Sequence, residues 1–222
     1  MIKNIVFDIG GVILNDSDEI LMKFLNKTKN EIIELKKIVY GKRFKECLLG
    51  NLTQKEYMEA LVNEFPEHKF EIEKLLMPKY QENVLPLKKE TLNIMYELKD
   101  KNYKIYFLSN LTESTYYYLK DKLNILDDFD GGIFSWKEHI VKPHKEIYEL
   151  LIQRYKINKD ETIFFDDSLK NVQVGNEFGI KSIQFKNVED IIKALFEEKS
   201  IWTRKHLMKL AVDYNLEEMK RG

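Results

Sequence analysis

Hydrophobic and polar positions divide the chain into a short apolar run, a long segment with helical spacing, and a segment in which two kinds of spacing alternate. The first run, from Asn4 to Phe7, ends in Asp8, and the pair Gly10 and Gly11 follows. This pattern predicts a buried strand that places one carboxylate at its carboxyl end. Open α/β sheets bind their ligands at that edge. Taken alone, the pattern also fits an ordinary strand, turn and capping aspartate.

Residues 15–85 lack strand-like runs and predict an all-helical insert after the first strand. Thr53 and Glu56 have the spacing of a capping box, so a helix is expected to begin there and to end at Pro66. Gly41 and Gly50 predict turns between helices. Apolar residues recur at helical spacing at Ile20, Leu21, Phe24, Leu25, Ile32, Ile33, Leu35 and Ile38.

Four polar residues of the insert lie between the two predicted turns: Lys42, Arg43, Lys45 and Glu46. They either face a substrate or form an exposed helical surface. The exposed surface is the favoured interpretation for most of them, because runs of charge on a helix are usually solvated.

From Leu87 onward, helical and strand-like spacing alternate, which predicts a parallel, doubly wound, Rossmann-like sheet with helices on both faces. The predicted strands are 104–108, 132–134, 162–165 and 181–185. The predicted helices are 89–101, 113–123, one opened by Pro143, 169–178 ended by Gly179, and 188–196. We therefore expect an α/β core domain of residues 1–14 and 86–199, a helical insert of residues 15–85, and an extra amphipathic helix over 200–222. That last helix either docks on the core or pairs with another subunit, and the oligomeric state stays open.

Composition narrows the range of functions. The 222 residues include 36 basic and 37 acidic ones, so no overall charge recruits nucleic acid or an anionic membrane. The single cysteine, Cys47, excludes an internal disulfide and a cysteine-based zinc site and fits a reducing cytoplasm. No run is long enough for a membrane span, and the acid and glycines near the start do not fit a signal peptide. We expect a cytoplasmic protein.

Polar residues follow three of the predicted strands. Asp8, the pair Ser109 and Asn110, and the pair Asp166 and Asp167 reach the same edge of a parallel sheet. Three carboxylates in one place need a compensating cation, and an oxygen-only cluster with room for water suits Mg²⁺. The histidines show no paired spacing that favours zinc: His68, His139, His144 and His206.

A tetrahedral anion fits the same edge. Ser109, Asn110 and adjacent backbone amides can bind such an anion, and Lys142 supplies a positive charge for it. Each of these residues alone has an ordinary structural explanation. Their combination in this order predicts a site for a tetrahedral anion.

The chain resembles the haloacid dehalogenase-like hydrolase superfamily in four motifs, Phe7–Val12, Leu108–Asn110, Lys142–Pro143 and Phe165–Ser168, the last with Asn171 following. The resemblance covers nearly the whole chain up to about residue 199, and the helical insert takes the place of that family's small cap domain.

In detail, the chain is most similar to the cap-bearing sugar-phosphate phosphatases of the superfamily, including the bacterial α-D-glucose-1-phosphate phosphatase type. This similarity extends into the insert at Gly41–Phe44 and Gly50–Thr53.

The resemblance implies that Asp8 is a nucleophile that forms an aspartyl-phosphate, which water then hydrolyses. It implies that Ser109 and Lys142 hold the transferring phosphoryl group, and that Gly10, Gly11 and Asn110 belong to the phosphate-binding set.

A magnesium site is implied as well. Mg²⁺ would be held by Asp8, by the backbone carbonyl of Gly10, and by at least one of Asp166 and Asp167. Asp167 is the expected direct ligand, with Asp166 behind it.

One position departs from the family pattern. Most phosphatases of this superfamily carry a second aspartate two residues after the nucleophile, where it acts as general acid and base, but this chain has Gly10. Positioned proton transfer is typically worth about 10²- to 10⁴-fold in rate. A leaving group that needs little protonation, a water molecule or a side chain of the insert would have to replace it. The glucose-1-phosphate phosphatase type is similar in having glycine here.

The leading hypothesis is a Mg²⁺-dependent phosphatase acting on a small phosphorylated metabolite, most plausibly a hexose phosphate. One alternative is a catalytically impaired binding or regulatory protein that keeps the fold. Another is a 2-haloacid dehalogenase, a class that lacks the second aspartate, but those enzymes need no metal and do not keep the acidic pair Asp166 and Asp167.

Overall fold

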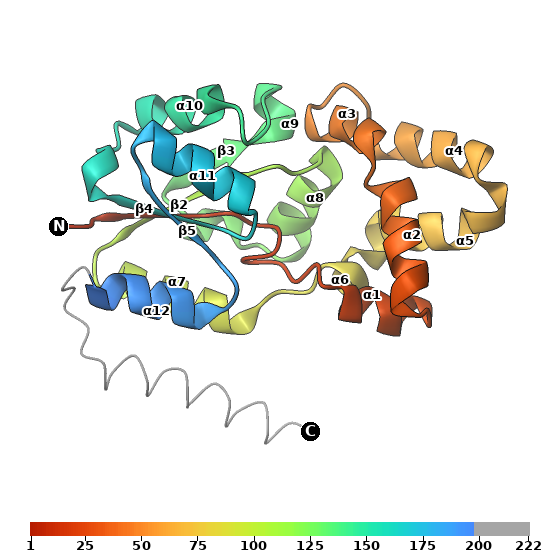
Figure 1. Cartoon of the computed structure of the whole chain (residues 1–222), viewed down its shortest axis with the longest axis horizontal. Helices are drawn as coiled ribbons and strands as arrows, with labels where there is room; N and C mark the ends of the chain where they lie inside the picture. Colours follow the sequence, from red (N-terminus) through yellow and green to blue (C-terminus); the bar gives the residue numbers. More distant parts are fainter. Residues whose placement is uncertain (198–222) are drawn as a thin grey trace, which may run out of the picture.

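The computed structural model describes residues 1–197 as a five-stranded parallel sheet between two helical layers, with a group of helices at one end (Figure 1). The strand order is β3-β2-β1-β4-β5. The strands are β1 (Asn4–Phe7), β2 (Lys104–Ser109), β3 (Gly131–Phe134), β4 (Thr162–Asp166) and β5 (Lys181–Gln184). This arrangement confirms the predicted doubly wound α/β core, whereas the helix predicted over 200–222 lies outside the described residues.

Alternate side chains of β1 point to opposite faces of the sheet, as the pleat of a strand requires. Ile5 and Phe7 belong to a hydrophobic cluster shared with helices α7 and α12, and Val6 belongs to a second cluster shared with α10 and α11. Because a parallel sheet is covered on both faces, the central strand β1 is buried along its whole length. These helices are α7 (Lys89–Asp100), α10 (Lys145–Tyr155), α11 (Leu169–Phe178) and α12 (Val188–Glu197).

The insert of residues 15–85 is helical and packs about a hydrophobic cluster of its own, in which Tyr57 and Ile72 are almost fully buried. Thr28 and Thr53 form capping boxes at the starts of two of its helices, and the second confirms the predicted start. The insert extends from the end of the sheet to the right in Figure 1. Its helices are α1 (Asp18–Leu25), α2 (Lys29–Val39), α3 (Lys45–Leu48), α4 (Gln54–Glu64), α5 (Lys69–Leu76) and α6 (Gln81–Val84).

Two helices of the core differ from those expected from the sequence. The helix expected over 113–123 consists of α8 (Glu113–Tyr117) and a π-helical turn, η4 (Tyr118–Lys122). The helix expected to open at Pro143 begins instead at Lys145, as α10. A separate short helix, α9 (Ser135–Glu138), follows β3.

The register of the sheet brings three strand ends to one level. Phe7, the last residue of β1, pairs with Phe107 of β2 and with Phe165 of β4. The next residue, Asp8, donates its backbone N–H to the Phe165 carbonyl at 2.8 Å and so continues the ladder by one step. The first strand therefore delivers Asp8 between the ends of β2 and β4.

Within residues 1–197, no helix combines the length and the apolar character that a membrane crossing requires.

Close packing of α11 on β5 depends on a glycine. A Cβ added at Gly175 would lie 2.3 Å from Oγ of Ser182, a buried residue of β5. Glycine to alanine usually stabilises a helix by about 1 kcal/mol. At this position we expect Gly175→Ala to lower the free energy of unfolding by about 1–3 kcal/mol, because the contact forces α11 off the sheet.

Urea denaturation measures that change. Gln173→Ala, an exposed position on the same helix, is the matched control and should stay within about 0.5 kcal/mol of the wild type. A Gly175→Ala protein as stable as this control would show that α11 does not need the close approach.

Candidate active site

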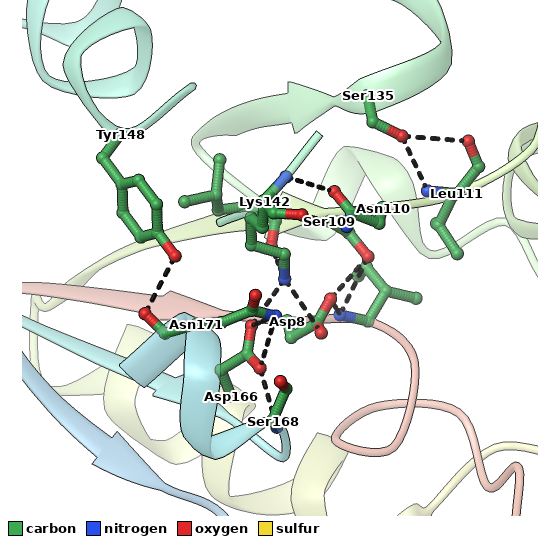
Figure 2. Close-up of polar contacts among 12 residues, drawn as sticks. Asp8, Ser109, Asn110, Leu111, Ser135, Lys142, Tyr148, Asp166, Ser168 and Asn171 are labelled. Carbon is green, nitrogen blue, oxygen red and sulfur yellow. Dashed lines mark hydrogen bonds and ion pairs between the residues drawn. The ribbon is translucent and has the colours of Figure 1, made fainter. Parts of the chain in front are cut away.

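A buried lysine joins two carboxylates at the carboxyl edge of the sheet. Lys142 Nζ lies 2.9 Å from Asp8 Oδ2 and 2.6 Å from Asp166 Oδ2, and it also donates to the Leu108 carbonyl at 2.7 Å. Figure 2 shows the lysine side chain pointing between the two acids. The three contacts use all three donors of the ammonium group. Its side chain is completely buried.

The second oxygen of Asp8 is held from the other side. Asp8 Oδ1 accepts the backbone N–H of Ile9 at 2.7 Å and the hydroxyl of Ser109 at 2.5 Å. Ser109 is the last residue of β2, so the register of β1 and β2 sets this contact. With Lys142 on Oδ2, both carboxylate oxygens of Asp8 have fixed directions (Figure 2).

Asp166, the last residue of β4, is also fixed at both oxygens. Oδ1 accepts the backbone N–H of Ser168 at 2.9 Å, and the Asn171 amide donates to Oδ1 at 2.9 Å and to Oδ2 at 3.1 Å. The Tyr148 hydroxyl, from α10, donates to the Asn171 carbonyl at 2.9 Å. The first turn of α11 is thereby tied both to the acid and to the neighbouring helix.

The Asn110 side chain forms two hydrogen bonds with the backbone of Lys142. Its amide donates to the Lys142 carbonyl at 3.0 Å, and its carbonyl oxygen accepts the Lys142 N–H at 2.8 Å. These two bonds hold the backbone before Pro143 outside the helix, and this is the physical reason why α10 begins two residues later than the proline predicts. In this structure, the Asn110 side chain positions the lysine.

The charges of the site act strongly on one another. Burial raises the pKa of Asp8 to about 7; the Lys142 ammonium opposes this rise and the Asp166 carboxylate adds to it. Burial alone would lower the pKa of Lys142, but the two carboxylates more than compensate and keep it above its ordinary value. The lysine is therefore the cation that limits the rise in the pKa of Asp8.

A third acid completes an all-oxygen cluster. Asp8, Asp166 and Asp167 each offer a carboxylate oxygen, and these oxygens lie within 4.8 Å of one another. Loss of hydration raises the pKa of Asp167, and the charges of Asp166 and Asp16 raise it further. Three carboxylates facing one ammonium group suit an additional hard cation.

The two glycines after Asp8 differ in what surrounds them. Gly11 has φ +67°, and a Cβ there would lie 2.6 Å from the Asp167 carboxyl carbon, so only glycine fits. Its carbonyl accepts a hydrogen bond from the Lys88 ammonium group. A Cβ at Gly10 would meet only one atom, Oδ2 of Asp16, at 4.0 Å.

The insert contacts the core beside this site through polar groups. Gln54 of α4 accepts the Thr112 hydroxyl at 2.7 Å, and Gln81 of α6 donates to the Ser114 hydroxyl at 3.1 Å. On the opposite side, the Leu49 carbonyl lies 2.6 Å from Nδ1 of His139. These bonds tie the insert to the first turn of α8 and to the residue after α9.

Two of the four polar residues between the predicted turns of the insert bind other residues of the insert. Arg43 forms an ion pair with Glu64 at 2.9 Å, and Glu46 accepts the Asn51 amide at 2.8 Å. The remaining two, Lys42 and Lys45, are exposed.

Residues 2–179 match the haloacid dehalogenase-like hydrolase family. The chain belongs to this family. It is 28% identical over 204 residues to D-ribitol-5-phosphate phosphatase of Bacteroides thetaiotaomicron, and the match covers 86% of this chain and 95% of that protein. As a member of the family, the chain is a hydrolase.

Solved structures of the haloacid dehalogenase-like fold share the architecture. A family enzyme from Bacteroides thetaiotaomicron matches with TM-score 0.68 and 23% identity, over 87% of this chain and 98% of that one. A structure of that enzyme with magnesium and inorganic phosphate matches with TM-score 0.66 and 23% identity, over 84% and 95%. L-2-haloacid dehalogenase from Xanthobacter autotrophicus matches with TM-score 0.61 and 20% identity, over 89% and 83%.

The structure of this hydrolase brings together Asp8, Gly10, Gly11, Ser109, Asn110, Lys142, Asp166 and Asp167, all of them named from the sequence. Sequence reasoning missed Tyr148, Lys88 and Asp16. The apolar face of α10 gives no sign that one of its aromatic residues bonds Asn171. Lys88 and Asp16 lie on the two chain segments that join core and insert, and a search for polar residues at these crossings would have found both.

Removing the ammonium group of Lys142 tests how much its ion pairs contribute to stability. We expect Lys142→Met to lower the free energy of unfolding by about 3–5 kcal/mol, because two buried carboxylates lose their cation. Urea denaturation in metal-free buffer measures this loss. The control is Lys145→Met, three residues away and 62% exposed, which should change little. Equal stability of the two variants would contradict a structural role for the buried ion pairs.

Proposed function

We propose that this hydrolase is a Mg²⁺-dependent phosphomonoesterase that acts on a small phosphorylated metabolite through an aspartyl-phosphate on Asp8. The observation that carries the proposal is the fixed geometry of Asp8, bonded to Ser109 and Lys142 and lying beside two further acids, Asp166 and Asp167. That set supplies a nucleophile, a cation for a phosphoryl group, and oxygen ligands for a metal.

Asp8 is the proposed nucleophile. Its oxygens are oriented by Ile9, Ser109 and Lys142, so the carboxylate does not have to reorganise when a phosphoryl group arrives. Attack by one oxygen on phosphorus gives the aspartyl-phosphate, and water hydrolyses it in a second step. Lys142 favours the charged form of this carboxylate, which is the form that a nucleophile requires.

Ser109 and Lys142 are proposed to hold the transferring phosphoryl group together with the backbone of Gly10 and Gly11. When an Asp8 oxygen bonds to phosphorus, its negative charge is lost and the donors on it are free to turn to the phosphoryl oxygens. Asn110 contributes by holding the backbone of Lys142. These roles are what phosphoryl transfer requires, since it depends on positioning and charge neutralisation.

The acidic cluster fits Mg²⁺, with Asp8, the Gly10 carbonyl and Asp167 as ligands. Asp166 accepts bonds at both oxygens from Ser168, Asn171 and Lys142, whereas the Asp167 carboxylate accepts none from another side chain of residues 1–197. Asp167 is therefore the proposed direct ligand, with Asp166 acting through its neighbours. A bound Mg²⁺ would offset the charge of the phosphoryl group and of the acids around it.

A sugar phosphate or sugar-alcohol phosphate is the proposed substrate class, a hexose phosphate being the expectation from the sequence. Support comes from the relative named D-ribitol-5-phosphate phosphatase, which covers nearly the same length. The insert of residues 15–85 is proposed to act as a cap over the core of residues 1–14 and 86–199, where it would exclude bulk water. The cytoplasmic location stays a prediction.

Phosphate release from a panel of sugar, sugar-alcohol and nucleoside phosphates tests the reaction. We expect Mg²⁺-dependent release by the wild type and at least about a 10³-fold loss in Asp8→Asn, since an amide is no nucleophile and single-residue losses in covalent catalysis reach this size. Full activity of Asp8→Asn would exclude the aspartyl-phosphate route.

Two other outcomes of this panel favour the alternatives. Metal-independent halide release from a 2-haloacid, without phosphate release, would show a dehalogenase. Absence of turnover with tight phosphate binding would show a binding protein.

Metal removal tests the acidic cluster. EDTA should abolish activity and added Mg²⁺ should restore it. Asp167→Asn should raise the Mg²⁺ concentration for half-maximal activity by at least about tenfold, because even residues behind metal ligands cost 10- to 100-fold in affinity. Asp160→Asn is the control, an exposed acid before β4 at the opposite edge of the sheet. An Asp167 variant with the same Mg²⁺ requirement as this control would remove Asp167 from the ligand set.

A further inference from the structure

Because residue 10 is glycine, the proposed reaction lacks an acid two residues after Asp8. The structure places another carboxylate, that of Asp16, beside Gly10. If residue 10 carried a Cβ, the nearest atom to it would be Oδ2 of Asp16, at 4.0 Å. An aspartate at position 10 would extend its carboxyl group from that same Cβ. The Asp16 oxygen therefore lies within a few ångström of the space that such a side chain would use.

The backbone between these residues explains the approach. Leu14 donates its N–H to the Ile9 carbonyl at 2.8 Å and forms a bridge with Gly10, so the chain turns back onto the end of β1. Asn15 then donates to the Pro86 carbonyl at 2.8 Å. Its side chain accepts the Ser17 N–H at 3.1 Å, a turn that encloses Asp16. Asp16 is thus held at the start of the insert, next to Gly10.

Within residues 1–197 the Asp16 carboxylate forms neither a hydrogen bond nor an ion pair, and the residue is exposed to solvent. Asp18, two residues later, is bonded to Lys36 at 2.8 Å. The charge of Asp16 is felt by Asp167, whose pKa it helps to raise after loss of hydration and the charge of Asp166. Asp16 is therefore accessible to water and close enough to Asp167 for their charges to interact.

We propose that Asp16 is the general acid and base of the phosphatase reaction; this inference rests on the proposed function. In the first step an Asp8 oxygen bonds to phosphorus, the bond between phosphorus and the ester oxygen breaks, and that oxygen takes the proton of the Asp16 carboxyl group. In the second step water attacks phosphorus and gives its proton to the Asp16 carboxylate, and the Asp8–phosphorus bond breaks. The products are the alcohol and inorganic phosphate, and both acids return to their starting forms.

The geometry suits this role because a general acid must come within hydrogen-bond reach of the leaving oxygen, directly or through one water. Asp8, Ser109 and Lys142 are committed to one another and are buried, so none of them can bring protons from solvent. Asp16 is an exposed carboxylate whose Oδ2 lies 4.0 Å from where a Cβ of residue 10 would be.

The test compares Asp16→Asn with Glu19→Gln, which removes a negative charge from an exposed position on α1. For the alkyl phosphate that the wild type hydrolyses fastest, Asp16→Asn should lower kcat by about 10²- to 10⁴-fold at saturating Mg²⁺. Glu19→Gln should match the wild type. Circular dichroism and thermal melting check that all variants fold.

A second substrate separates proton transfer from other roles. 4-Nitrophenyl phosphate has a leaving group that departs without protonation. Asp16→Asn should release the first equivalent of 4-nitrophenol as fast as the wild type and then turn over slowly, because the base for water is missing. Such a burst reports accumulated aspartyl-phosphate, which a structural role of Asp16 would not produce.

Rescue by a carboxylate at the neighbouring position completes the test. The space around Gly10 permits a Cβ. Gly10→Asp in the Asp16→Asn background should therefore raise kcat by at least about tenfold, because the new carboxylate restores part of the proton transfer that Asp16→Asn removes. The proposal is overturned if Asp16→Asn matches the wild type on the alkyl phosphate, or if saturating Mg²⁺ alone restores its activity, which would make Asp16 a metal-site residue. Absence of phosphatase activity in the wild type would instead overturn the proposed function itself.

Discussion

The ion pairs of Lys142 with Asp8 and Asp166 are the interaction on which the site depends. A buried ammonium group is tolerated only when its donors are used, and here all three are, two of them by charged partners. Removing the lysine would leave two buried carboxylates without their cation, and removing either acid would leave one ammonium donor without its partner. The structure around the lysine therefore has to hold three strand ends and one loop in fixed relation.

Each neighbouring residue serves that requirement. Asn110 fixes the backbone of Lys142, Asn171 fixes both oxygens of Asp166, and Tyr148 anchors Asn171 from the next helix. The register of β1 with β2 and β4 then decides which side chains meet. A shift of one residue in either pair would turn the acid to the opposite face of the sheet. The hydrophobic pattern of the strands thus controls the chemistry at their ends.

This dependence explains what the sequence alone could predict. Polar residues directly after apolar strands must meet at one edge of a parallel sheet, so Asp8, Ser109 and Asp166 were found without coordinates. Asp16 was not found from periodicity, because its place beside Gly10 depends on a turn of the backbone; only its position at the crossing from core to insert marks it in the sequence. The late start of α10 has the same origin, since the hydrogen bonds of Asn110 to Lys142 override the preference of proline for a first helical turn.

The proposed proton donor, Asp16, lies on the insert, and this has a mechanical consequence. An acid at Gly10 would be fixed to β1, whereas Asp16 is the first residue beyond the crossing where Leu14 bridges Leu87 and Asn15 bonds Pro86. Both chain segments that join insert and core pass through this crossing. A displacement of α1 would change the separation of Asp16 from Asp8, whereas Lys142 holds Asp8 in place from the core. The sheet thus holds Asp8 buried and fixed, whereas the place of Asp16, and with it the proposed proton transfer, depends on where the insert stands.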